Sequence, residues 1–87
     1  MSRIEGTVLS AAGKPVAHAR VFFSAAPGAV SDVALLSGAD GRFVLSAPHA
    51  GRYEISASHD TLGSGRAEVV VGADGAAPRA LQIKLSR

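Results

Sequence analysis

The sequence predicts an all-β fold, a seven-stranded antiparallel sandwich, with residues 1–87 forming a single domain. Three observations predict this class. Short segments alternate between apolar and polar residues with a period of two, which is typical of strands that are buried on one face only. Turn signals rich in glycine or proline separate these segments at intervals of about 10–15 residues, which is the rhythm of an antiparallel sandwich. No interval is long enough for an amphipathic helix of several turns with a cap at each end.

The strands expected from this alternation cover residues 3–9, 17–24, 32–37, 42–47, 52–58, 66–71 and 80–85. The third of them shows the weakest pattern. In the fourth, Phe43 and Leu45 are expected to turn inward because they share one side of the strand. The tight Ala-Asp-Gly turn at 39–41 predicts that the strands on either side of it pair as a hairpin. The alanine-rich stretch 25–30 is expected to be a loop or a short helical turn.

The composition argues against several classes of partner. The chain has no cysteine, so disulfides and thiolate chemistry are absent. Its nine lysines and arginines never form a run, and three phenylalanines and one tyrosine are its only aromatic residues, so we expect no nucleic-acid partner. No segment approaches the roughly 18 apolar residues of a membrane span.

The first residues have none of the features of a signal peptide. Arg3 and Glu5 interrupt the apolar run that such a peptide needs. We therefore expect a cytoplasmic location if the chain is complete. The lack of cysteine fits a reducing compartment, and it fits equally a module inside a larger extracellular chain.

Residue types that carry chemistry are present but are not arranged for it. The three histidines, His18, His49 and His59, show neither of the ligand spacings HxH and HxxxH, so we expect no metal and no other cofactor. No GxSxG elbow occurs for a nucleophilic serine, and the Gly-Ser-Gly sequence at 63–65 is interpreted as a flexible turn. The glycines also lack the spacing of a phosphate-binding loop. We predict no catalytic residue.

Four stretches of sequence resemble the carboxypeptidase regulatory-like domains in the expected order, and together they lie between residues 4 and 57. They are IEGTV at 4–8, GKPVAHARV at 13–21, SGADGRF at 37–43 and GRYEISA at 51–57. The resemblance implies a transthyretin-like, prealbumin-type Greek-key sandwich. Within it, Gly6 is expected where a neighbouring strand crosses too closely for a side chain. Tyr53 is expected to fill the core with its ring while its hydroxyl reaches the rim.

Enzymes that share this fold do not match the chain. The 5-hydroxyisourate hydrolases need a C-terminal tetrapeptide that contains tyrosine, and this chain ends in Lys-Leu-Ser-Arg at 84–87. The intradiol dioxygenases bind iron through two tyrosines and two histidines, and Tyr53 is the single tyrosine here. The resemblance therefore implies a non-catalytic module.

Outward-facing residues are the remaining candidates for function. Phe22 and Phe23 are adjacent on one strand, so Phe22 faces outward if Phe23 lies in the core. Arg20 shares the side of Phe22, and an arginine beside an aromatic residue is common at interfaces. Val44 also points outward. We predict that Arg20, Phe22 and Val44 contact a protein partner or an adjacent domain.

Other interpretations stay open at this stage. An unpaired edge strand offers a second way to accept a partner. A carbohydrate-binding module is the main alternative, although the chain has no tryptophan to serve as a sugar platform. A small hydrolase is a third. Glycan-array binding, turnover of an ester or ureide, and pull-down of one stoichiometric protein would distinguish these classes.

Overall fold

The computed structural model describes residues 2–28, 35–74 and 81–86. These parts contain seven strands and no helix. The strands are β1 (Ser2–Leu9), β2 (Arg20–Ala25), β3 (Leu35–Leu36), β4 (Arg42–Ala47), β5 (Gly51–His59), β6 (Gly63–Val71) and β7 (Leu81–Lys84).

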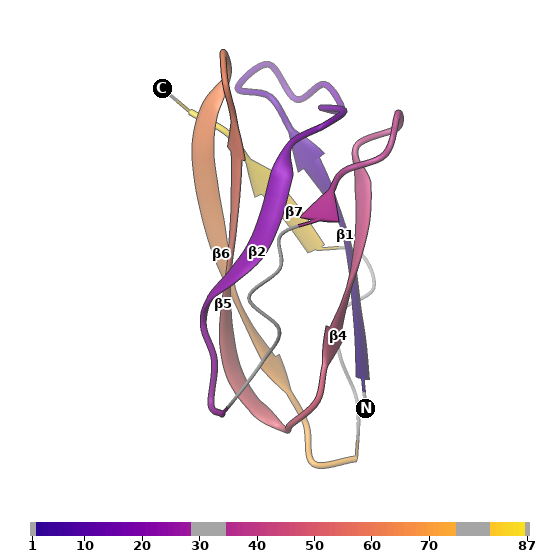
Figure 1. The fold of residues 1–87 in the computed structure, drawn as a ribbon, viewed down its shortest axis with the longest axis vertical. Helices are drawn as coiled ribbons and strands as arrows, with labels where there is room; N and C mark the ends of the chain where they lie inside the picture. Colours follow the sequence, from indigo (N-terminus) through magenta and orange to yellow (C-terminus); the bar gives the residue numbers. More distant parts are fainter. Residues whose placement is uncertain (1, 29–34, 75–80, 87) are drawn as a thin grey trace.

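The strands form two sheets that pack face to face, with strand orders β4-β1-β7 and β3-β2-β5-β6 (Figure 1). The predicted all-β sandwich is thus confirmed. One pairing differs from the expectation of a purely antiparallel fold, because β1 and β7 run parallel, with Gly6 opposite Leu81. β6 ends at the end of the sandwich where β1 begins (Figure 1), and β7 lies alongside the second half of β1, from Gly6 to Leu9, and runs in the same direction.

The predicted hairpin around residues 39–41 is wrong. β3 pairs with β2 and β4 pairs with β1, so the connection between β3 and β4 passes from one sheet to the other. The turn itself is tight, with the Gly41 N–H donating to the Gly38 carbonyl at 2.9 Å. The two ends of the turn are bonded to different sheets. The Ser37 N–H donates to the carbonyl of Ala19, which directly precedes β2, whereas the Gly41 carbonyl accepts from the N–H of Val8 in β1. A positive φ of 78° at Gly41 permits this change of direction.

Two strands begin at other residues than expected. β2 starts at Arg20 rather than at 17, because His18 adopts a φ of 61° and interrupts the extended backbone. β6 starts at Gly63, so the interpretation of 63–65 as a turn is wrong. Gly65 lies inside this strand, and a Cβ there would collide with the Lys84 carbonyl oxygen of β7. Glycine is needed at this point because the two sheets approach each other closely.

Part of the third predicted strand, residues 32–34, lies outside the described residues, as do residues 29 and 30 of the stretch 25–30. Within the described part of that stretch, Ala25 ends β2, and Ala26 to Gly28 lie in no strand or helix.

Side chains from both sheets form one hydrophobic core. The largest fully buried side chains are Tyr53, Ile4, Ile55, Ile83, Leu85, Val8 and Val21. Phe43 is buried against β1, where a Cβ on Gly6 would come within 2.5 Å of its ring. The predicted need for glycine at position 6 is therefore confirmed, with Phe43 and the Leu81 carbonyl as the close neighbours.

Tyr53 fills the core as predicted. Its ring packs against Phe23 with the ring centroids 5.0 Å apart. Its hydroxyl donates to the His49 carbonyl at 2.6 Å and accepts from the His49 N–H at 3.0 Å. One buried side chain thereby holds the turn between β4 and β5.

Candidate functional site

The residues that carry chemistry lie apart in the structure. His18 precedes β2, His49 lies in the turn after β4, and His59 ends β5. Within residues 2–28, 35–74 and 81–86, no three His, Asp or Glu side chains gather as they would around a metal ion. In the same residues, no helix has the length and apolar character that crossing a membrane requires.

The structure separates the three residues predicted to contact a partner. Arg20 and Phe22 lie on the outer face of β2, as the alternation predicts. Val44 also points outward and is 40% exposed, but it lies on β4 in the other sheet. Since the outer faces of a sandwich point in opposite directions, Val44 and Phe22 cannot contact the same flat surface.

The strand register shows what accompanies Arg20 and Phe22. Arg20 lies opposite Leu36 of β3 on one side and Ser58 of β5 on the other. Leu36 is 59% exposed, so an exposed apolar side chain lies opposite Arg20. The sequence alone did not indicate Leu36, because Leu36 comes next to Arg20 only when β3 pairs with β2.

The next row along the sheet adds a second arginine. Phe22 lies opposite Ser56, and Ser56 lies opposite Arg66 of β6. Phe22 is half-buried and Arg66 is exposed. We call the side chains of these two rows the basic patch, which consists of Arg20, Phe22, Leu36, Ser56, Ser58, Ser64 and Arg66.

A shallow hollow of about 470 Å³ crosses the basic patch. Its lining contains four hydroxyls, one aromatic ring and one guanidinium, and it contains no carboxylate. These side chains belong to Ser56, Ser58, Ser64, Ser86, Phe22 and Arg66. Ser86 joins them because its backbone exchanges hydrogen bonds with Ser64 at 3.0 and 3.1 Å.

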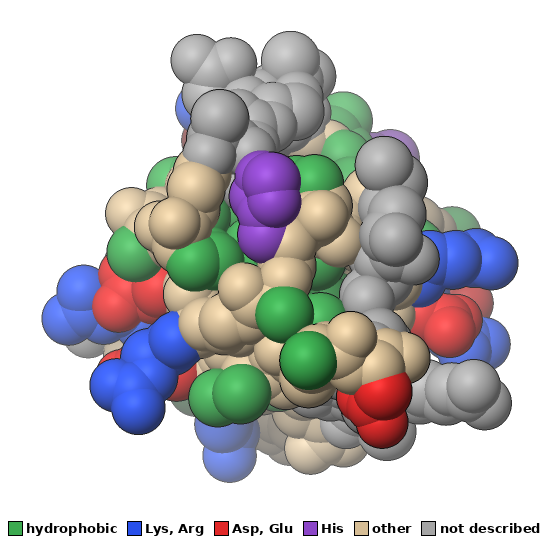
Figure 2. Space-filling model, turned by 90° about the horizontal axis from the view of Figure 1, so that it is seen from below, with side chains coloured by type: hydrophobic (Ala, Val, Ile, Leu, Met, Phe, Trp, Pro, Cys, Tyr) green, Lys and Arg blue, Asp and Glu red, His purple; other side chains and the backbone are tan. Residues whose placement is uncertain are grey.

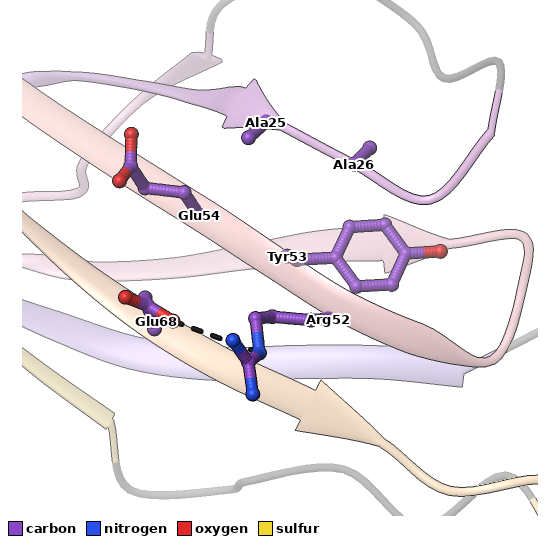
Figure 3. A pocket seen from close by; sticks show the side chains of 6 residues that line it. All are labelled: Ala25, Ala26, Arg52, Tyr53, Glu54 and Glu68. Atoms are coloured by element: carbon purple, nitrogen blue, oxygen red, sulfur yellow. Dashed lines mark ion pairs between the residues drawn. The ribbon is translucent and has the colours of Figure 1, made fainter.

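The other half of the same face is acidic. Glu54 and Glu68 are direct cross-strand partners on β5 and β6, and like charges in such positions repel each other. Each has a neighbour that offsets this repulsion: the Ser24 hydroxyl donates to Glu54 at 2.7 Å, and Arg52 lies 3.7 Å from Glu68. Figure 3 shows Arg52, Glu54 and Glu68 around a hollow of about 320 Å³ beside Ala25.

The ion pair between Arg52 and Glu68 adds little to stability. Both side chains are well exposed, at 75% and 63%. A surface pair of this kind contributes about 0–1 kcal/mol. The main consequence of the acidic half is therefore its charge, which differs in sign from that of the basic patch.

The described residues at the end of the sandwich that carries the turn at His49 form no comparable patch. Figure 2 views this end and shows green apolar side chains scattered among polar ones, with the acidic and basic side chains around the rim. The phenol of Tyr53 is fully buried beneath it. Tyr53 is therefore not available as a platform for stacking a sugar ring.

Comparison with known families agrees with this architecture. The model of the carboxypeptidase regulatory-like domain matches residues 3–86. The chain belongs to this family. The match includes residues 58–86, which lie beyond the motif resemblance, and so extends over β6 and β7 as well. No curated protein matches the chain significantly.

Membership of the regulatory-like domains bears on the type of function. This family is non-catalytic, and its fold is a sandwich of the kind described above. In such a domain, exposed apolar side chains beside charged ones indicate where another molecule can bind. The basic patch has Leu36 opposite Arg20, and the other half of the same face has the exposed Val70 opposite Arg52.

Proposed function

We propose that this regulatory-like domain is a single, non-catalytic interaction module. It uses the outer face of the β3-β2-β5-β6 sheet to contact a protein partner or a neighbouring domain. The observation that carries the proposal is the strand register, which aligns Arg20 with Leu36 and puts Phe22 in the adjacent row.

The composition of this face supports the proposal. Aromatic residues and arginine are enriched at protein interfaces, whereas lysine and acidic residues are depleted from their centres. The basic patch contains two arginines, a half-buried phenylalanine and the 59% exposed Leu36. An exposed leucine on the same face as a half-buried aromatic ring gains from leaving water when a partner covers both.

The opposite sheet presents a different surface. On its outer face, Val44 lies opposite Glu5 of β1, and Thr7 lies between Arg42 and Gln82. Val44 is the one large exposed hydrophobic residue on this sheet among the described residues. We therefore assign partner contact to Arg20 and Phe22 and regard Val44 as a solvated surface residue.

Photo-crosslinking in the native host tests this assignment. A photoreactive amino acid in place of Leu36 is expected to form a covalent adduct with one defined protein. The same residue in place of Val44 is the matched control, since both positions are exposed valine or leucine sites on outer faces. Adducts of equal yield from both positions, or an adduct from position 44 alone, would contradict the proposal.

A further inference from the structure

We infer that the basic patch binds a short, extended, acidic segment of its protein partner. This inference rests on the proposed function and specifies the chemistry of the partner. It starts from the charge of the hollow described above: Arg66 lines it, Arg20 lies opposite Ser58 of its lining, and the lining includes no carboxylate. Guanidinium groups bind carboxylates through paired, charge-assisted hydrogen bonds.

The serines of the hollow add hydrogen-bonding capacity. Within the described parts of the chain, the hydroxyls of Ser58, Ser64 and Ser86 bond to no other protein group, whereas Ser56 donates to Ser24 at 2.8 Å. A hydroxyl can donate to a carboxylate or to a backbone carbonyl of a bound peptide. Phe22, which lines the hollow from β2, offers a contact for an apolar side chain.

The register determines how far apart two carboxylates would bind. Arg20 and Arg66 are separated by one strand and by two residues along the sheet. Adjacent strands lie about 4.8 Å apart and residues rise about 3.4 Å, so the two Cα atoms are about 12 Å apart. In an extended peptide, residues four apart share a side and span about 13 Å. The patch therefore fits acidic residues at i and i+4 with an apolar residue at i+2.

The acidic half of the face limits the length of this ligand. Glu68 follows Arg66 by two residues on the same side of β6, and Glu54 lies beside it. A long polyanion that continued along β6 beyond Arg66 would meet Glu68, with Glu54 opposite it. This arrangement favours a short acidic peptide over a nucleic acid, and the half-buried position of Phe22 disfavours a sugar platform.

A nuclear magnetic resonance titration of the whole ¹⁵N-labelled chain tests the inference. The probe is the capped peptide Thr-Glu-Thr-Leu-Thr-Glu-Thr, and its control has glutamine in place of both glutamates. We expect the acidic peptide to shift the amide signals of Ser56, Ser58, Ser64 and Arg66. We expect the control peptide to bind at least about fivefold more weakly, which is the range of an exposed ion pair at each end.

Charge-reversal variants identify the groups responsible. The double variant Arg20→Glu, Arg66→Glu is expected to weaken binding about tenfold or more, since both ion pairs become repulsive. The matched control is Arg3→Glu, Arg42→Glu, which makes the same change in net charge on the outer face of the other sheet. It should leave the Kd within twofold. Urea unfolding of both variants verifies that each is folded.

Several results would overturn the inference. They are equal binding of the two peptides, equal loss of affinity in the two double variants, and signal shifts centred on β1 and β4. Larger shifts at the same amides with oligothymidylate or trigalacturonate would assign the patch to nucleic acid or acidic sugars instead. If position 36 forms an adduct but the acidic peptide does not bind, only the inference of an acidic ligand is wrong. If position 36 forms no adduct, the proposed interaction face is itself wrong.

Discussion

The two outer faces of the sandwich differ although the same alternation produces both. On the β3-β2-β5-β6 sheet, arginine, phenylalanine and leucine occupy neighbouring register positions, with serines between them. On the β4-β1-β7 sheet, Val44 lies opposite Glu5, and polar or charged residues occupy the adjacent positions. An outward-facing residue is thus a candidate for binding only when its cross-strand neighbours are also residues that could contact a partner.

This comparison explains why one predicted contact residue is reassigned. Arg20, Phe22 and Val44 look alike in the sequence, because each takes the outward place in an alternating segment. The structure keeps Arg20 and Phe22 together and moves Val44 to the opposite side of the molecule. Arg20 and Phe22 therefore belong to one candidate surface, and Val44 serves as a control position outside it.

The largest expected effect comes from the interior that both faces share. Phe43→Ala should lower the free energy of unfolding by about 3–5 kcal/mol, since it leaves a cavity over Gly6. The neighbouring substitution Val44→Ala, on the outward side of the same strand, should cost about 0.5 kcal/mol or less. Urea denaturation of both variants measures the difference. A loss below about 1 kcal/mol for Phe43→Ala would contradict the inward position of its ring.

An intermediate effect is expected where the basic patch is anchored. Ser37 is buried, and its hydroxyl accepts from the Ala19 N–H at 3.0 Å and donates to the Val16 carbonyl at 2.6 Å. Ser37→Ala leaves both backbone groups without that partner and should cost about 1–3 kcal/mol. Because Leu36 precedes Ser37 and Arg20 follows Ala19, the variant should also loosen the edge of the patch.

Thermal unfolding and amide hydrogen exchange check this prediction. The exposed Ser46, on the outer face of the other sheet, supplies the control Ser46→Ala, which should change stability by less than about 0.5 kcal/mol. Similar stabilities for the two variants would show that the buried hydroxyl contributes nothing to holding Ala19.

Substitutions on the two outer faces should have the smallest effect on stability, and they compare the two faces most directly. Phe22→Ser and Val44→Ser should each lower the free energy of unfolding by about 1 kcal/mol or less, because both side chains are partly or largely exposed. Only Phe22→Ser should reduce the yield of the photo-crosslink from position 36. Unfolding of the Phe22→Ser variant would instead place that ring in the core.

Much of the fold follows from local patterns. The inward positions of Phe43 and Leu45 were predictable because side chains alternate along a strand whatever the strand pairs with. The need for glycine at position 6 was predictable from the motif. The buried role of Ser37 was not, since it depends on the backbone of residues 16–19, which the chain brings close only after folding.

The sequence by itself determined which side of each strand is apolar, where most turns fall and to which family the chain belongs. Only the tertiary structure decided which strands are neighbours, that β1 and β7 run parallel, and that the turn at 39–41 connects two sheets. The physical reason is that alternation is a property of consecutive residues, whereas sheet membership and register depend on contacts between residues far apart in the chain. The basic patch is built from such contacts, so it becomes visible only when β2, β3, β5 and β6 are assembled.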